Sequence, residues 1–371
     1  MAWIIAIVLM NLYIFTQTPS EWRHDRRVKT LMLIVLSIGC CAFIIMTIAF
    51  NRMDDGAFKS FILYTSTIYY SWTAVAFWIV LLRKFLFYSI RHFNSVIAMN
   101  LLGNKALFIV LAVAITIAYT AGGINNINHL VETTYTIDVD KSGKCDDMTI
   151  ALVSDIHSGS GANEAVLQEM KEKINRMNAD ICIIAGDMFD VYTSKTDIEK
   201  TCDAFAEVKT KYGVIYVDGN HDYDCKYEWK EAVKAAGVVT LNNKAIQLDN
   251  GVAIVGISYS PISKESKTNA ARLVNQAGIS EEAPCILVKH YPKKLAEVSK
   301  GSDVVLCGHT HGYQYPNVAF YSKFVFDNPY GLKQCGDAQC ITTSGVGAWC
   351  FHAKWPSHSE VVRLELRFGD K

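Results

Sequence analysis

The sequence predicts an α/β protein in which two β-sheets pack together between layers of helices, preceded by a region of four transmembrane helices. Three observations lead to this prediction. Four long apolar segments occupy the first 125 of the 371 residues. Beyond them, short β-branched runs alternate with amphipathic segments, a pattern typical of repeated βα units. The carboxy-terminal part then consists mostly of strand-like segments, which predict a second sheet.

The apolar segments cover roughly residues 2–16, 30–50, 61–82 and 106–121. A transmembrane helix needs about 20 apolar residues. The second and third segments meet this length, and the first and fourth are counted as spans together with their flanks. The first segment lacks the charged start and the small-residue cleavage site of a signal peptide. We therefore expect a multi-pass protein of the cytoplasmic membrane; a buried helical hairpin is the alternative.

The charges divide the chain into two parts of opposite sign. The first 130 residues carry ten Lys and Arg against four Asp and Glu, and the rest carry 26 against 32. The basic residues between the first and second segments, and between the third and fourth, favour a cytoplasmic location for those loops. This topology makes the catalytic part extracytoplasmic. No basic run marks that part, so a nucleic acid polymer is not expected as a partner.

Five apolar strands in the second part each end in residues of the type that bind metals. The runs 150–153, 181–185, 214–217, 286–289 and 304–306 are expected to be buried strands. In an open α/β sheet, ligands bind at the carboxyl ends of the strands. The residues that follow these ends are Asp155, His157, Asp187, Asn220, His221, His290, His309 and His311.

These residue types indicate a metal site. A single Asp-x-His or Gly-Asp pair is usually a turn or a helix cap, but five such exits in one chain are difficult to explain by turns alone. Carboxylate and imidazole ligands without cysteine suit Mn, Fe or Zn and exclude a thiolate zinc site. Cys307 precedes Gly308 within a strand and is expected to pack inward.

The motifs that carry these residues resemble those of the calcineurin-like metallophosphoesterases, and in particular the membrane-tethered branch of that superfamily. The resemblance covers residues 145–370 and rests on the strings SDIHSG, GD, VDGNHDY, ILVKHYP and GHTHGYQ. It implies the two-sheet αββα sandwich of that family. The domains expected from this are a transmembrane region at 1–125, a linker with the first strand at 126–146, and the phosphoesterase domain at 147–371.

The resemblance also implies a role for each residue. Two divalent metal ions (Mn, Zn or Fe) are expected, with Asp187 bridging both because its carboxylate can serve two cations. The first ion would take Asp155, His157 and His311, and the second would take Asn220, His290 and His309. His221 is expected to act as the general acid toward the leaving oxygen or to stabilise the charge of the transition state.

The expected function is hydrolysis of a phosphoester or pyrophosphate bond. The tether favours a membrane lipid or lipid-linked nucleotide as substrate, with activity like that of UDP-2,3-diacylglucosamine hydrolase or of a phospholipid phosphoesterase. A UDP-linked lipid would favour a cytoplasmic active site, which conflicts with the topology above. The alternatives are a membrane-anchored phosphodiesterase of soluble nucleotides and a non-catalytic metal-binding sensor.

Several further residues have two interpretations from sequence alone. Asp190 and Asp222 would support the site, or stabilise a turn and cap a helix. Lys289 would contact the substrate phosphate or pack in the core, and Trp349 would line the substrate pocket or pack at an edge. Cys335 and Cys340 are the best local candidates for a disulfide bond among the eleven cysteines.

Overall fold

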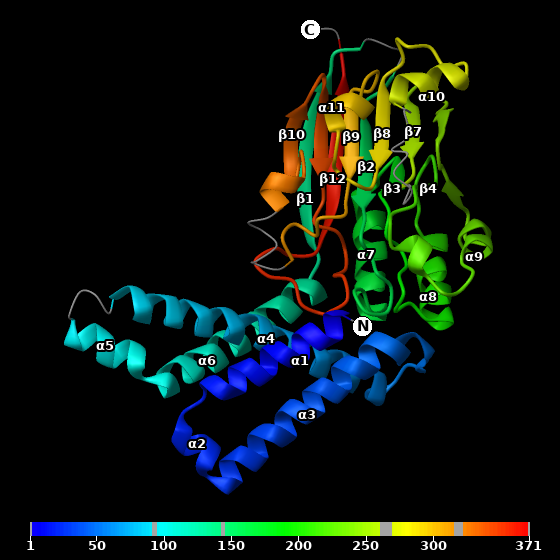
Figure 1. Ribbon diagram of the computed structural model, residues 1–371. Helices are drawn as coiled ribbons and strands as arrows, with labels where there is room; N and C mark the ends of the chain where they lie inside the picture. Colours follow the sequence, from blue (N-terminus) through cyan, green and yellow to red (C-terminus); the bar gives the residue numbers. More distant parts are fainter. Residues whose placement is uncertain (1, 91–94, 142–144, 260–268, 315–321, 370–371) are drawn as a thin grey trace. The chain divides into compact units, whose positions relative to one another are not determined.

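The computed structural model describes residues 2–90, 95–141, 145–259, 269–314 and 322–369. The chain divides into two compact units, residues Met1–Gly122 and Gly123–Lys371. Among the described residues of the first unit, the regular secondary structure is helical (Figure 1). Its elements are α1 (Ala2–Gln17), α2 (Ser20–His24), α3 (Arg26–Ala49), the 3-10 turn η1 (Phe50–Arg52), α4 (Ala57–Ile90), α5 (Val96–Gly103) and α6 (Lys105–Asn128), the last of which continues into the second unit.

Three helices of the described chain, not the four expected, are long and apolar enough to cross a membrane. They are Arg26–Arg52, Ala57–Ile90 and Lys105–Asn128. The first expected span is wrong by this measure because α1 has only 16 residues and ends at Gln17, before Pro19. At 1.5 Å per residue it is about 24 Å long, shorter than the roughly 30 Å hydrocarbon layer. The fourth segment is longer than its apolar run because α6 continues through Asn128.

The second unit contains two six-stranded mixed sheets, which confirms the predicted α/β sandwich. The strand orders are β1-β12-β2-β3-β4-β5 and β10-β11-β9-β8-β7-β6. The strands of the first sheet are β1 (Val131–Val139), β2 (Met148–Val153), β3 (Ile181–Ile184), β4 (Val214–Tyr216), β5 (Val238–Thr240) and β12 (Glu360–Phe368). Those of the second are β6 (Lys244–Gln247), β7 (Ala253–Ile257), β8 (Cys285–Lys289), β9 (Val304–Cys307), β10 (Gly331–Cys335) and β11 (Ala338–Thr342).

Alternation along the strands explains how the two sheets pack. In β2, Ile150 and Leu152 face the core between the sheets, whereas Ala151 and Val153 face the helices on the outer side. The outer helices of the first sheet are α7 (Glu164–Met177), α8 (Lys195–Ala206) and α9 (Lys230–Ala235), and those of the second are α10 (Ala270–Gln276) and α11 (Leu295–Val298). Strands buried on both faces need continuous apolar runs, as the sequence has.

The proposed disulfide bond is not present: all eleven cysteines are free thiols. In the β10–β11 hairpin, Cys335 pairs with Ala338 and Cys340 pairs with Lys333, so the two cysteines are out of register. Both thiols are buried in the core that the second sheet forms with its outer helices.

Candidate metal centre

The predicted site residues lie in loops that leave the carboxyl ends of neighbouring strands. The exits of β2, β3 and β4 carry Asp155, Asp187 and Asn220, and these strands are adjacent and parallel. In the second sheet, β8 and β9 are likewise adjacent and parallel, and they lead to His290 and to the turn with His309 and His311. Parallel neighbours end at the same edge of a sheet, so residues up to 156 positions apart in sequence reach one place.

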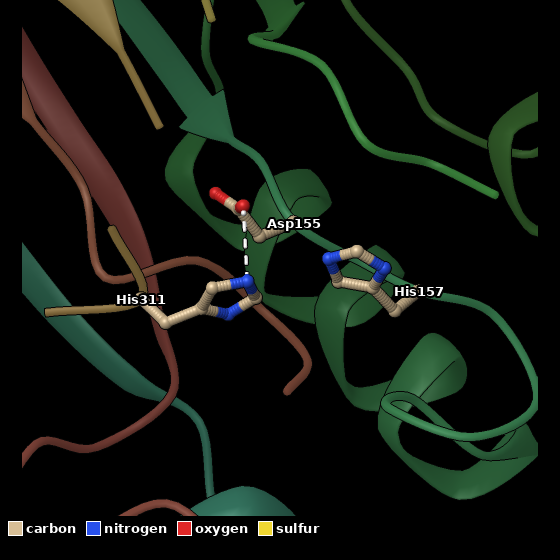
Figure 2. Close-up of side chains that lie close together, drawn as sticks. All are labelled: Asp155, His157 and His311. Atoms are coloured by element: carbon tan, nitrogen blue, oxygen red, sulfur yellow. Dashed lines mark ion pairs between the residues drawn. The ribbon is translucent and has the colours of Figure 1, made fainter. Parts of the chain in front are cut away.

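Asp155, His157 and His311 form the first of two groups that can hold a metal ion. One candidate ligand atom from each lies within 4.8 Å of the others, and all three side chains are buried. His311 Nε2 is 3.4 Å from Asp155 Oδ1. Figure 2 shows both imidazole rings turned toward the Asp155 carboxylate, and the two rings stack with centroids 5.1 Å apart and planes inclined by 26°.

Asp187, His290 and His309 form the second group, again with ligand atoms within 4.8 Å. Asp187 Oδ2 lies 2.9 Å from His290 Nε2 and 3.8 Å from His157 Nε2, which belongs to the first group. A single carboxylate therefore faces both groups. This is the geometry that a bridging ligand between two cations requires.

Asn220 and His221 complete the set. The Asn220 side chain contributes a buried amide oxygen, and the backbone N–H of His221 donates to Asp187 Oδ1 at 2.8 Å. The His221 ring lies 5.4 Å from the His157 ring and stacks on Trp349 at 5.1 Å. Its Nδ1 is 3.3 Å from Asp224 Oδ2, in the 3-10 turn η3 (Asp222–Asp224). His221 thus lies beside the first group, and Asn220 precedes it in the loop after β4.

The hydrogen-bonding state of these side chains tests whether the residues fit metal ions. Within the described part of the chain, the buried side-chain atoms at the site without a hydrogen-bond partner include His157 Nε2, Asn220 Oδ1, His309 Nδ1 and His311 Nδ1. An unpaired buried polar atom costs about 1–3 kcal/mol. Cations would engage such lone pairs, so the donor set fits the two divalent ions expected for this fold.

Half of the described non-glycine residues with positive φ belong to the same site. Among the described residues, ten residues other than glycine have positive φ, and five of them are Asp155, His157, Asp187, His309 and His311. Such conformations cost of order 1–3 kcal/mol each and persist only where the surroundings enforce them. Glycine is needed beside them: a Cβ on Gly219 would collide with the Asp187 carboxylate, and one on Gly308 would collide with Ser154 Oγ.

Hydrogen bonds fix the orientation of two ligand rings. His157 Nδ1 lies 3.0 Å from Asp190 Oδ2, and His290 Nδ1 lies 2.7 Å from the carbonyl oxygen of Ala185. A ring that donates Nδ1–H to a fixed acceptor presents Nε2 with its lone pair free for a metal. Asp190 therefore supports the site, which sequence alone left open.

Asp222 is also a supporting residue and not a helix cap. Its carboxylate accepts hydrogen bonds from the backbone N–H groups of Asp187, Phe189 and Gly219 at 2.7–3.0 Å. It thereby ties the loop after β3 to the loop after β4. Burial and the Asp187 charge raise the pKa of Asp222 to about 7.

Electrostatics keep two of the imidazoles neutral. Burial, with repulsion from His290, lowers the pKa of His309 to about 3. Burial, with His157, lowers the pKa of His311 well below its ordinary value. Burial would also lower the pKa of His290, but the Asp187 carboxylate overcomes this effect and raises it to about 9. Neutral His309 and His311 have the lone pairs that a metal needs.

The structure distinguishes between the two interpretations of Lys289 and of Trp349. Lys289 is not directed at a phosphate, because its Nζ donates to the carbonyl oxygen of Lys293 and burial lowers its pKa. Trp349 lies at the site through its stacking on His221 and is 38% exposed. Sequence reasoning missed Tyr291, whose ring centroid is 4.4 Å from that of His309. The sequence signal that could have indicated Tyr291 is its position directly after His290.

Sequence reasoning also missed Lys354 and Glu360, which bind the turn next to Asp155. Lys354 is fully buried, and its Nζ donates to the carbonyl oxygens of Ser344 and Gly345. Glu360 accepts from the backbone N–H of Ser344 at 2.7 Å. These contacts hold the turn at Gly345, where a Cβ would collide with Asp155. No local sequence signal marks Lys354 and Glu360, because they bind the same turn only in the folded chain.

Comparison with known proteins agrees with the geometry. Residues 148–313 match the family described as calcineurin-like phosphoesterase. An uncharacterized metallophosphoesterase of Helicobacter pylori is 28% identical over 239 residues, or 62% of each chain. A transmembrane protein with metallophosphoesterase domain from Bos taurus is 23% identical, with 97% of this chain and 87% of that protein covered. The chain thus spans about three fifths of the length of the Helicobacter relative.

Two solved structures are distant matches. TT1561 of Thermus thermophilus is 12% identical with a TM-score of 0.38, covering 54% of this chain and 90% of that one. A dimetal phosphatase from Danio rerio is 11% identical with a TM-score of 0.35, covering 54% and 88%. The sequence match and the two metal-type groups define the class: this chain contains a calcineurin-like metallophosphoesterase domain. Among its relatives are transmembrane proteins that carry such a domain.

Proposed function

We propose that the protein is a metal-dependent hydrolase of phosphoester or pyrophosphate bonds. The observation that carries the proposal is the position of Asp187 between two groups of metal-type side chains. In this proposal Asp155, His157 and His311 hold the first ion with Asp187. Asn220, His290 and His309 hold the second ion, also with Asp187. The domains are then a transmembrane region at 1–125, a linker with the first strand at 126–146, and a phosphoesterase domain at 147–371.

The proposed mechanism assigns the proton transfer to His221. Two bound divalent ions would offset the charge on the phosphate oxygens and make water a better nucleophile. Since Nδ1 of His221 faces the Asp224 carboxylate, the ring donates from Nε2 toward the leaving oxygen when both of its nitrogens are protonated. Water adds to phosphorus and releases one proton to the solvent, while the bond from phosphorus to the leaving oxygen breaks and that oxygen takes the proton from Nε2. The solvent then returns a proton to His221. Trp349, stacked on the ring, holds the imidazole in this orientation.

The proposed substrate is a membrane lipid or a lipid-linked nucleotide, including substrates of the UDP-2,3-diacylglucosamine type. The three helices able to cross a membrane support a substrate that resides there. Hydrolysis of soluble nucleotides by an anchored phosphodiesterase is the second candidate. A metal-binding sensor is disfavoured, because His221 adds a proton donor that metal binding does not need.

We further propose that the protein is a multi-pass protein of the cytoplasmic membrane with its catalytic domain outside. Basic residues lie just before α3 and in its first turn (Arg23, Arg26, Arg27 and Lys29), and others lie between α4 and α6 and at the start of α6 (Arg91 and Lys105). With three spans the positive-inside rule still puts the chain after α6 outside. The length of α1 therefore decides only the location of the amino terminus. Alkaline phosphatase fused after residue 371 should be active, and an inactive fusion would contradict this orientation.

The proposed function is tested by phosphate release from the purified full-length protein loaded with Mn, Zn or Fe. Lipid, lipid-linked nucleotide and soluble diester substrates are assayed in parallel, with a chelator-treated sample as control. Turnover that requires metal is expected. Absence of turnover with all three metals and all substrates, in protein shown to contain two ions, would favour the sensor.

A further inference from the structure

The loop of residues 349–359, which precedes β12, connects the metal centre to the end of α6. On one side it contacts the segment that carries His309 and His311: Ser357 Oγ donates to the carbonyl oxygen of His311 at 2.9 Å. The Gln314 amide donates to the carbonyl oxygens of Trp349, Phe351 and Ala353, and accepts from the backbone N–H of Trp349 at 3.0 Å. This side of the loop is thus part of the wall of the site.

On its other side, the same loop is bonded to the last turns of α6. The backbone N–H of Lys354 donates to the carbonyl oxygen of Gly123 at 3.1 Å. The Asn126 amide donates to the carbonyl oxygens of Lys354 and Ser357, and the Asn126 carbonyl oxygen accepts from the N–H of Ser359. Ile127 is fully buried in the core formed with the outer helices of the first sheet. The end of α6 is therefore fixed to this loop.

The length of α6 gives the depth at which this junction lies. The helix is unbroken from Lys105 to Asn128 and is one of the three that can cross a membrane (Figure 1). About 20 residues at 1.5 Å each cross the roughly 30 Å hydrocarbon layer, so a span that begins at Lys105 ends near Ile124. Gly123 and Asn126 are consequently at the boundary between hydrocarbon and headgroups, and so is the loop bonded to them.

The composition of the loop suits that boundary. Trp355, one residue from the contact with Gly123, is 40% exposed, and Trp349 is 38% exposed. Tryptophan is enriched at membrane interfaces, where its ring contacts apolar groups and its N–H remains near water. Trp349 is five residues from Lys354, a reach of at most about 18 Å. Two short turns fold this part of the loop back on itself.

From these contacts we propose that the 349–359 loop holds the metal centre at the membrane surface. Trp355 and Trp349 lie in the headgroup layer, and the site takes the phosphate of a lipid whose chains remain in the bilayer. The inference rests on the proposed function and narrows its substrate to lipids. Because Trp349 stacks on His221, the leaving oxygen of such a lipid would approach the proton donor from the membrane side.

The position of the loop is tested without any turnover. Full-length protein labelled with 5-fluorotryptophan is placed in phosphatidylcholine nanodiscs, and the seven tryptophan signals are assigned with single Trp→Phe variants. A lipid with a gadolinium chelate on its headgroup should broaden the signals of Trp355 and Trp349 several-fold more than that of Trp229. Trp229 is the matched control because it is buried beside α9 in the same unit. Equal broadening of Trp355 and Trp229 would overturn the proposal.

The substrate class has a separate test. Nanodiscs containing phosphatidic acid or phosphatidylglycerol supply a monoester and a diester lipid, and bis(p-nitrophenyl) phosphate is the soluble probe. For Trp355→Ala, the ratio of lipid turnover to soluble turnover should fall about tenfold, the effect of one lost large apolar contact. Leu332→Ala, an exposed apolar residue on β10, should leave this ratio unchanged.

The two proposals fail in different ways. Turnover of the soluble probe without turnover of either lipid would overturn the lipid assignment and leave the phosphoesterase standing. Loss of all turnover in metal-loaded protein would overturn the proposed function, whereas the fluorine signals would still decide the position of the loop.

Discussion

Asp190 offers the sharpest test of how the first metal group is held. Its carboxylate, fully buried, lies 3.0 Å from Nδ1 of His157 and also accepts from the backbone N–H of Tyr192. In Asp190→Asn the shape is kept, but a charge-assisted hydrogen bond becomes a neutral one. Such bonds contribute about 1.5–3 kcal/mol when charged and about 1 kcal/mol when neutral. The loss of about 1.4 kcal/mol corresponds to roughly tenfold weaker metal binding at this group.

The assay is competition between the protein and a fluorescent zinc chelator, which resolves two dissociation constants. Asp190→Asn should weaken the constant of one ion about tenfold and change the other little, because His290 and His309 do not contact Asp190. Asp180→Asn is the matched control: its carboxylate also accepts a backbone N–H, from Thr149, at the opposite edge of the sheet. Unchanged constants in Asp190→Asn, or an equal change in Asp180→Asn, would refute this reasoning.

Three further predictions follow from named contacts. His221→Ala should keep its metal content and lose about 10²–10⁴-fold in turnover; full turnover, measured beside elemental analysis, would exclude the proton donor. Lys354, whose pKa burial lowers to about 7 against the opposing effect of Asp155 and Glu360, is destabilising when charged below pH 7. That cost is relieved as pH rises toward 10.5, so the unfolding free energy should rise by about 2.3 kcal/mol between pH 7 and 9 relative to Lys354→Met. Parallel thermal-shift profiles of the two proteins would contradict this prediction. Because all eleven cysteines are free, alkylation of unreduced, denatured protein should label all eleven, and fewer labels by mass spectrometry would reveal a disulfide bond.

The sequence was sufficient to predict the sandwich and the strand exits, because both depend on local patterns. Runs such as Val304–Cys307 are β-branched, apolar and ended by glycine, which selects a buried strand followed by a tight turn. Parallel strands then bring their ends together without further information.

The supporting contacts could not be predicted, because they join positions distant in sequence. Glu360 is the first residue of β12 and resembles any strand-edge acid until the fold brings it to Ser344. Asp222 precedes a helical segment and has the sequence of a cap, yet its carboxylate bonds back to the loop after β3. The first expected span was wrong because the flank after Thr16 was counted as part of it, whereas α1 ends at Gln17.

The central claim is that Asp187 holds two cations together at the rim of the sheets. Elemental analysis of active full-length protein, before and after Asp187→Ala, tests it most directly. The account predicts about two transition-metal ions per chain in the active protein and loss of both, with activity, in the variant. Active protein without bound metal, or a variant that keeps two ions, would contradict it.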